Sequence, residues 1–227
     1  MVYNSPLFGV VLTVAVYILA DAFRRRSEIA IANPLLVSIV MIIGILSTFR
    51  IPLEAYDVGG DWITLLVKPA TVALAIPLYY HYEILMKNLK AVMIGIGGGV
   101  VLSLLSVVVM SRMLGLSQDL KASLMSKSIT TPIGIEVTKQ VGGIVPLAIA
   151  AIIITGILGA LIGPSLLKLL KIDDKTACGI ALGTSAHVIG TSKAIEMDEE
   201  VGAMSAVAIP IAGILTVIMA PFFINLF

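Results

Sequence analysis

Long apolar stretches recur along the 227-residue chain, and they constrain its fold more than any other feature. Most are about as long as the roughly 20 residues that an α-helix needs to cross the hydrocarbon core of a bilayer. Only 13% of the residues are charged, against about 25% in an average soluble domain. The sequence therefore predicts an all-α polytopic membrane protein with about six full transmembrane helices. The expected spans are Pro6–Ala22, Ile29–Phe49, Trp62–Tyr82, Ala91–Met110, Ile144–Leu167 and Ala203–Phe227.

Two further segments, Gln118–Gln140 and Lys175–Glu200, are apolar enough to enter a membrane but are interrupted by polar residues, Gly or Pro. Interrupted helices are tolerated at membrane depth only where protein covers the freed backbone groups or where they line a wet cavity. We therefore expect two broken or re-entrant helical segments beside a pathway. The positive-inside rule favours the re-entrant form, because full crossings would place Lys168, Lys171 and Lys175 outside.

The two broken segments resemble each other at an offset of 60 positions. Thr131–Gly143 superposes on Thr191–Ala203 with five identities in thirteen positions. Apolar sequences resemble one another, so a chance match is the alternative. One complete crossing lies between the copies, which gives them opposite orientations, as in the inverted repeats of secondary transporters. The sequence thus predicts a scaffold and dimerisation part, residues 1–116, and an inverted-repeat transport part, residues 117–227.

Each copy contains residues suited to a small anion. Thr131 followed by Pro132 predicts an N-cap and the first turn of a short half-helix, whose positive end favours a carboxylate. Gly190 and Thr191 would start the half-helix of the second copy. A basic side chain four residues before each Thr would lie on the same helical face. The predicted substrate-binding residues are Lys127, Ser128, Thr130, Thr131, Pro132, Thr184, Ser185, His187, Gly190 and Thr191.

Each of these residues also has a purely structural interpretation. Thr in a membrane helix more often bonds to a backbone carbonyl or joins two helices than binds a ligand. His187 is either an interior hydrogen-bonded side chain or a proton carrier. Glu136 and Glu196 are the other proton-coupling candidates, and the alternative for both is an interfacial carboxylate paired with Lys.

Several function classes are disfavoured by the sequence. It contains no P-loop, no G-x-S-x-G motif and no Cys or His set with metal-ligand spacing. The 15 basic residues nearly balance the 14 acidic ones, whereas nucleic-acid binding shows as clustered excess base. We therefore expect no enzymatic activity, no metal or cofactor and no nucleic-acid partner.

Four motifs resemble the LrgB/CidB family. They are NPLL at Asn33–Leu36, KPATVALAIPLY at Lys68–Tyr79, KSITTPIGIEV at Lys127–Val137, and GIALGTSAHVIGTSKAIEMDEEVGAMSAVA at Gly179–Ala208. The resemblance covers nearly the whole chain, with Lys68 as a departure where a neutral residue is expected. The resemblance relates the chain to two groups of proteins with different functions. Bacterial members are named antiholin-like proteins, linked to murein hydrolase control and a small LrgA/CidA partner, and plastid relatives are glycolate/glycerate translocators.

The residues and the resemblance together predict a secondary transporter of small monocarboxylates, such as glycolate, glycerate, lactate or pyruvate. We expect a multi-pass protein of the cytoplasmic membrane, proton-coupled and homodimeric, in which the re-entrant segments move or gate the site. The alternative is an antiholin-like regulator of a holin-like partner and of murein hydrolase activity, without transport.

Overall fold

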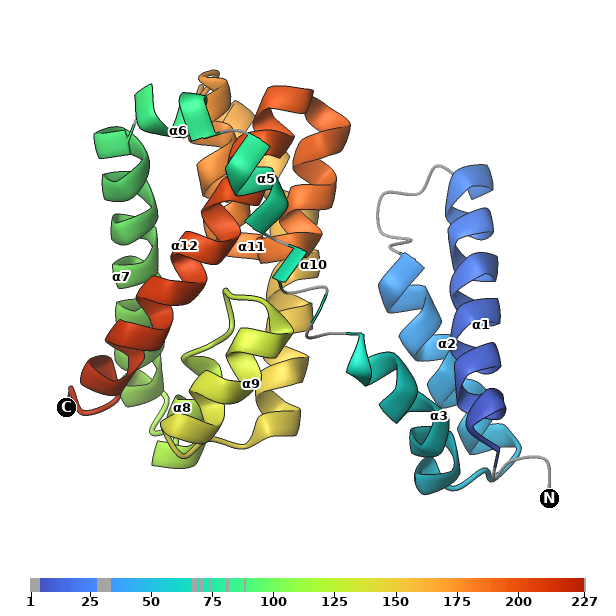
Figure 1. Ribbon diagram of the computed structural model, residues 1–227. Helices are drawn as coiled ribbons and strands as arrows, with labels where there is room; N and C mark the ends of the chain where they lie inside the picture. Colours follow the sequence, from blue (N-terminus) through green and yellow to red (C-terminus); the bar gives the residue numbers. More distant parts are fainter. Residues whose placement is uncertain are drawn as a thin grey trace. The chain divides into compact units, whose positions relative to one another are not determined.

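The structure is a computed structural model that describes residues 5–27, 34–66, 69, 72–73, 75–80, 82–87 and 89–226. The regular secondary structure of these residues is helical throughout (Figure 1). The chain divides into two compact units, an N-terminal unit, Met1–Val72, and a C-terminal unit, Ala73–Phe227. Helix α7 (Leu89–Met113) belongs to the C-terminal unit and packs against its helices.

The N-terminal unit contains α1 (Pro6–Ser27), α2 (Pro34–Thr48) and α3 (Leu53–Leu65). Helix α1 packs against both of the others. Gly9 and Gly59 let α1 and α3 cross at very short range, since a Cβ on Gly59 would lie 2.6 Å from the Gly9 Cα. Helix α3 begins nine residues before the predicted span at Trp62.

Four helices among the described residues are long and apolar enough to cross a bilayer, and α2 contributes a shorter apolar helix. The chain is thus a multi-pass helical membrane protein. The four are α1, α7, α10 (Val145–Leu169) and α12 (Glu199–Phe223). They coincide with four of the six predicted spans.

The other two predicted spans are described only in part. In Ile29–Phe49 the described helix is α2, of 15 residues, and Asn33 before it lies outside the described residues. In Trp62–Tyr82 the described residues include the end of α3 and α5 (Ala75–Tyr80). Lys68 lies outside the described residues.

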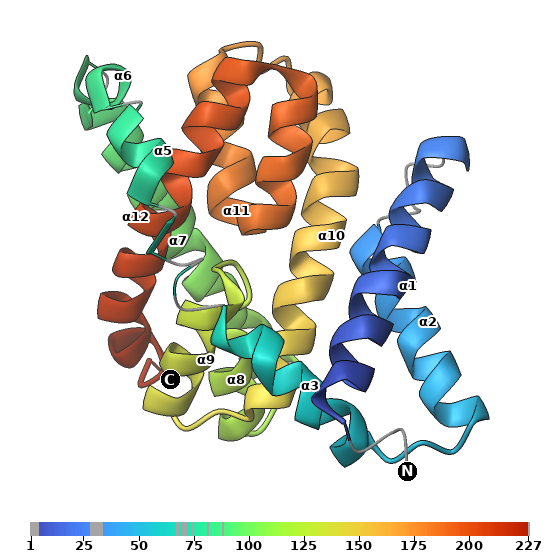
Figure 2. The ribbon, with the colours of Figure 1, turned by 45° about the vertical axis from the view of Figure 1, so that its right-hand side comes forward.

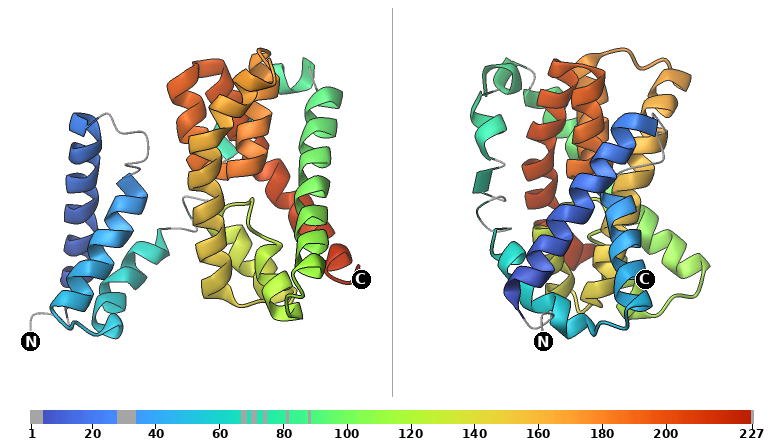
Figure 3. Two further views of the ribbon diagram at one scale, coloured as in Figure 1. Left: turned by 180° about the vertical axis from the view of Figure 1, so that it is seen from behind. Right: turned by 90° about the vertical axis from the view of Figure 1, so that its right-hand side faces the viewer.

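The C-terminal unit holds both broken segments. The first comprises α8 (Gln118–Leu124) and α9 (Thr131–Gln140), and the second is α11 (Lys175–Met197). In Figures 1, 2 and 3 the α8–α9 pair lies toward one end of this unit and α11 toward the other. The segments therefore enter the unit from opposite ends. The remaining short helix, α6 (Tyr82–Lys87), precedes α7.

Each broken segment is a hairpin whose two ends lie together. In the first, the backbone N–H of Ile144, just after α9, donates to Ser123 Oγ of α8 at 2.7 Å. In the second, Lys175 Nζ at the start of α11 lies 2.8 Å from Asp198 Oδ2, just beyond the end of α11. In both segments a direct contact therefore joins the two ends.

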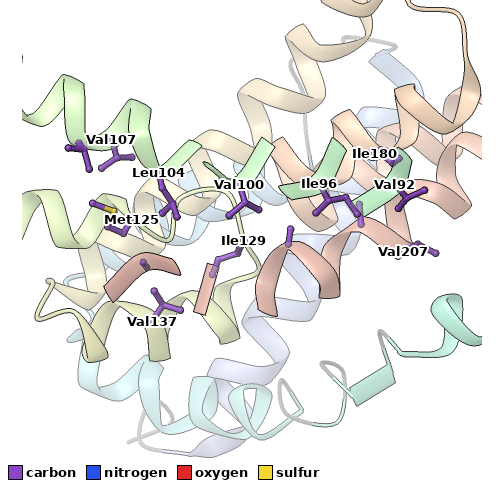
Figure 4. Close-up of a cluster of buried hydrophobic side chains, with 14 of the residues drawn as sticks. Val92, Ile96, Val100, Leu104, Val107, Met125, Ile129, Val137, Ile180 and Val207 are labelled. Carbon is purple, nitrogen blue, oxygen red and sulfur yellow. The ribbon is translucent and has the colours of Figure 1, made fainter. Parts of the chain in front are cut away.

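A buried apolar cluster attaches the first hairpin to α7 (Figure 4). Four residues of α7 recur at every fourth position and form one helical stripe. Met125 and Ile129, from the loop between α8 and α9, are buried in the same cluster, as is Val207 of α12. The loop is therefore fixed in place by its apolar side chains, which leaves its polar ones free to face elsewhere. The stripe of α7 consists of Val92, Ile96, Val100 and Leu104.

Candidate functional site

A cavity of about 1040 Å³ lies between α7, α10 and the first half of α11, and the loop after α8 closes one part of it. Its lining is mainly apolar or Gly. Several polar side chains line it from the middle of these helices and from the loop. These inner polar residues are Ser103, Lys127, Ser128, Thr155, Thr184 and Ser185.

Lys127 is the basic side chain among the residues that line this cavity. Its Nζ donates to Ser103 Oγ of α7 at 3.0 Å and to Ser128 Oγ at 3.2 Å. The two serine hydroxyls lie 3.0 Å from each other. Within the described part of the chain, Lys127 forms no ion pair with a carboxylate. Its ammonium group therefore brings an uncompensated positive charge to the cavity.

Thr184 brings the second hairpin to the same place. Its side chain is 6% exposed, and its Oγ1 has no hydrogen-bond partner among the described residues. Its methyl group packs against Gly99 of α7, where a Cβ would lie 2.8 Å from Cγ2. A buried hydroxyl without a partner costs about 1–3 kcal/mol. Thr184 is thus a buried hydroxyl beside the cavity without a partner among the described residues.

A second, small cavity of about 10 Å³ confirms that the hairpins approach each other. It is lined from the first hairpin by Ser128 and from the second by Thr184, together with Ser103 of α7 and Thr216 of α12. Its volume is close to that needed for one water molecule. We refer to Ser103, Lys127, Ser128 and Thr184 as the lysine–hydroxyl cluster.

The first helix start lies one residue earlier than predicted. Thr130 is the N-cap of α9, with extended backbone (φ −65°, ψ 147°), and its carbonyl accepts the Gly134 N–H at 2.8 Å. Thr131 is already helical, with Pro132 in the first turn. The Thr130 Oγ1 is buried and has no partner in the described part of the chain, so it does not cap the helix. These three residues are not among those lining the large cavity.

The second break lies at His187 rather than at Gly190. His187 has φ 43° and ψ −135°, a conformation that side-chain-bearing residues rarely adopt, and it divides α11 into two halves. Gly190 lies inside the second half, where a Cβ would come within 2.6 Å of Ala186 Cβ and of the Leu182 carbonyl oxygen. Gly190 therefore permits the two halves to pack together and does not begin a helix.

His187 points toward α10 and not into the large cavity. Its Nε2 lies 3.0 Å from the carbonyl oxygen of Ile152, and its ring packs on Gly156, where a Cβ would meet Cε1 at 2.7 Å. The side chain is 4% exposed. This geometry is that of an interior hydrogen-bonded His that fixes the break to α10. Its role as a proton carrier stays a prediction.

A buried pair of hydroxyl groups closes each hairpin. In the first, Ser126 Oγ and Thr138 Oγ1 lie 2.8 Å apart. In the second, Thr191 Oγ1 donates to the His187 carbonyl at 2.9 Å and lies 2.8 Å from Ser205 Oγ of α12. Thr191 thus has the helix-joining role that the sequence left open as the alternative to ligand binding.

The acidic proton-coupling candidates lie on exposed parts of the hairpins. Glu136 pairs with Lys139 at 2.9 Å, and Glu196 pairs with Lys193 at 3.0 Å, each three residues apart on one helix. These positions fit surface carboxylates paired with Lys. Participation of either Glu in proton transfer remains a prediction.

An exposed ion pair holds the ends of the second hairpin together. The hydrogen bond from Lys175 keeps the pKa of the Asp198 carboxyl below its ordinary value, and the same bond raises the pKa of the Lys175 ammonium. Asp198 also accepts the Glu200 N–H at 2.9 Å and so caps α12. The contact that joins the two ends of this hairpin therefore consists of two titratable side chains, Lys175 and Asp198.

Sequence reasoning did not single out Ser103. The signal was present, since Gly95, Gly99 and Ser103 recur at every fourth position and so share one face of α7. A stripe of small residues indicates close helix packing. The third member of this stripe is a hydroxyl, which places a hydrogen-bonding group where the second hairpin packs.

Comparison with known proteins gives one family. A model described as the LrgB-like family matches residues 13–226. The "Uncharacterized protein YwbG" of Bacillus subtilis (strain 168) is 36% identical over 214 residues, which are 94% of this chain and 95% of that protein. The "Uncharacterized protein YxaC" of the same organism is 34% identical over 218 residues, 96% and 95% of the two chains. No solved structure matches the chain.

Proposed function

The chain belongs to the LrgB-like family, and from this premise and the geometry of the lysine–hydroxyl cluster we propose that it is a secondary transporter of small monocarboxylates in the cytoplasmic membrane. The observation that carries the proposal is the shared lining of one cavity by residues of both hairpins. Lys127 and Ser128 come from the first, and Thr184 and Ser185 from the second.

The chemistry of the cluster suits one carboxylate. Lys127 supplies a single positive charge that no carboxylate of the described residues neutralises. The Thr184 hydroxyl can donate to the oxygens of the anion, as can one of the Ser103 and Ser128 hydroxyls, which share one hydrogen bond with each other. A dicarboxylate would bring a second negative charge, and Lys127 is the one basic side chain among the described residues that line the cavity. Glycolate, glycerate, lactate and pyruvate are the candidate substrates.

Transport requires that the site open to each side in turn. Two hairpins that enter from opposite ends are re-entrant segments of an inverted repeat, with the substrate bound between them near the bilayer midplane. Movement of the hairpins against a fixed scaffold would alternate the access. The N-terminal part is the proposed scaffold and dimerisation region, and the functional protein is a homodimer, alone or with a small LrgA/CidA-type partner. The proposed coupling ion is the proton, carried by His187, Glu136 or Glu196.

Uptake into proteoliposomes tests this function. The wild-type protein takes up labelled pyruvate or glycolate above the level of protein-free liposomes. Lys127→Met lowers the uptake by about tenfold to a hundredfold, the loss expected when hydrogen bonds to a charged group are removed. Lys168→Met is the control, because Lys168 of α10 is exposed and does not line the cavity. It keeps wild-type uptake.

The same experiment separates the alternative function. An antiholin-like regulator without transport shows no uptake of any small monocarboxylate, while still binding a holin-like partner. Equal uptake by Lys127→Met and Lys168→Met would show that the lysine–hydroxyl cluster is not the substrate site.

A further inference from the structure

Most of the large cavity is not accounted for by a small carboxylate. From Ser103 to Ala91 its lining follows α7 for twelve residues, about 18 Å at the helical rise of 1.5 Å per residue. Along this length the walls are Ile94 and Leu102 of α7, Leu158 and Ile162 of α10, and Ile180 of α11. A carboxylate of two or three carbons bound at Lys127 reaches none of the far part. The total of about 1040 Å³ is at the upper end of the range for pockets that bind drug-sized ligands.

The two ends of this groove differ in charge. Lys127 lies at the inner end without an ion pair among the described residues, and Asp174 lines the opposite part near the start of α11. A carboxylate is therefore attracted to the inner end, and a second carboxylate near Asp174 would meet a like charge. The apolar walls between them offer no hydrogen bonds to a polyhydroxylated chain.

We propose that the site prefers monocarboxylates with an unbranched aliphatic chain, whose carboxylate binds the lysine–hydroxyl cluster and whose chain lies along the apolar groove between α7, α10 and α11. This inference rests on the proposed function and defines the substrate class of the same site. The charge at Lys127 determines the orientation of the ligand, because only its head group is anionic. The ligand that this groove favours is thus an amphiphilic acid of medium length.

The apolar groove makes a quantitative prediction. Removing one methylene from water contributes up to about a fourfold gain in affinity, and roughly threefold is expected in a groove that remains partly open. Hexanoate, with four more methylenes than acetate, should bind about 50- to 100-fold more tightly. Succinate should bind no more tightly than acetate, because its second carboxylate is placed in the groove.

Two adjacent Gly residues of α7 provide matched variants. Gly98 lines the groove, and Gly97 does not. A Cβ at either position would contact nothing within 4 Å, so both positions have open space where a side chain begins. Gly98→Leu fills part of the groove, whereas Gly97→Leu adds the same side chain outside it.

The test is equilibrium binding to the full-length protein in lipid nanodiscs, without a pH gradient, with binding to empty nanodiscs subtracted. Labelled pyruvate is displaced with straight-chain acids from acetate to octanoate. Wild type and Gly97→Leu show a gain of roughly threefold per methylene, Gly98→Leu loses the gain for the longer acids but keeps acetate binding, and Lys127→Met weakens binding of the whole series.

Two results would overturn the inference. An affinity that does not change with chain length would show that the groove does not hold the substrate chain. Octanoate binding that Lys127→Met leaves unchanged would show that a lipid-like chain partitions into the groove without recognition of its carboxylate. Either result leaves the uptake of pyruvate and its loss in Lys127→Met intact, so failure of the chain-length preference is distinguishable from failure of the transport proposal.

Discussion

The two hairpins reverse the chain in different ways. The first turns through the loop from Met125 to Thr130, whose apolar side chains are buried against α7 while Lys127 and Ser128 line the cavity. The second turns at one residue, His187, whose side chain bonds to α10. Although the two segments are similar in sequence, Lys127 of the first lines the cavity, whereas His187 of the second is buried against α10. Two segments of similar construction can thus differ in the role of their basic side chain, since Lys127 lines the cavity and His187 fixes its own break to α10.

The largest expected effect concerns the second break. His187→Ala removes the bond to the Ile152 carbonyl and the packing on Gly156 but keeps a side chain at a positive φ, so the free energy of unfolding should fall by about 2 kcal/mol or more. His187→Gly also loses the ring but relieves the backbone, and should regain about 1 kcal/mol of this loss. Unfolding titrations in mixed micelles measure both.

Val188→Ala is the control for these variants, because Val188 is the adjacent, exposed residue. It should change the free energy of unfolding by no more than about 0.5 kcal/mol. If His187→Gly is less stable than His187→Ala, the positive φ is not a source of strain, and the proposed difference between the two breaks loses its physical basis.

A smaller difference is expected between the hydroxyl pairs. Ser126→Ala leaves Thr138 Oγ1 fully buried without its partner, and should destabilise the protein by about 1–3 kcal/mol. Ser205→Ala leaves Thr191 still bonded to the His187 carbonyl, so its loss should be about 0.5–1 kcal/mol.

The same unfolding titrations compare the two Ser variants with Ser192→Ala, whose exposed hydroxyl bonds only to its own helix. Equal losses for Ser126→Ala and Ser205→Ala would mean that the second bond of Thr191 contributes nothing measurable.

The smallest effect is pH-dependent and is confined to the second hairpin. Because the folded-state pKa of Asp198 is lowered, its pairing with Lys175 stabilises the protein above the ordinary carboxyl pKa, and this contribution is lost as the pH falls through the lowered value. Because the pKa of Lys175 is raised, the contribution is complete below the ordinary Lys pKa and is lost as the pH rises through the raised value. Asp198→Asn should therefore lower Tm slightly at neutral pH.

Thermal unfolding of Asp198→Asn and wild type across the acid range checks this prediction. The difference in Tm should disappear as Asp198 becomes protonated. Ser123→Ala removes the hydrogen bond between Ser123 and Ile144 that joins the ends of the first hairpin, and neither of these groups titrates in the acid range. Its difference in Tm from wild type should therefore not disappear as the pH falls. A pH-independent difference for Asp198→Asn would contradict the assignment of the ion pair.

The helical membrane fold follows from features that are local in the sequence. Four long apolar runs become α1, α7, α10 and α12, because their length and composition determine their state. The locations of the two broken segments can also be predicted from the sequence, since polar residues, Gly and Pro interrupt their apolar runs.

The candidate site was predictable only in part. Lys127 and Thr184 could be selected because polar groups inside apolar segments require partners or a wet cavity. The direction of His187 could not, because it depends on Gly156 of α10, which is distant in the sequence. The position of the second break was missed for a related reason. A positive φ at a residue other than Gly is stabilised by its tertiary surroundings and has no clear sequence signature.

The central claim is that residues of both hairpins bind one ligand, and a double-mutant cycle on Lys127→Met and Thr184→Val tests it most directly. The measurement is the dissociation constant of labelled pyruvate for the four proteins in nanodiscs. If both side chains hold the same carboxylate, the loss in the double variant should be at least about fivefold smaller than the product of the two single losses. Single losses that multiply to within about twofold would show that the two residues act independently, and would contradict a shared site.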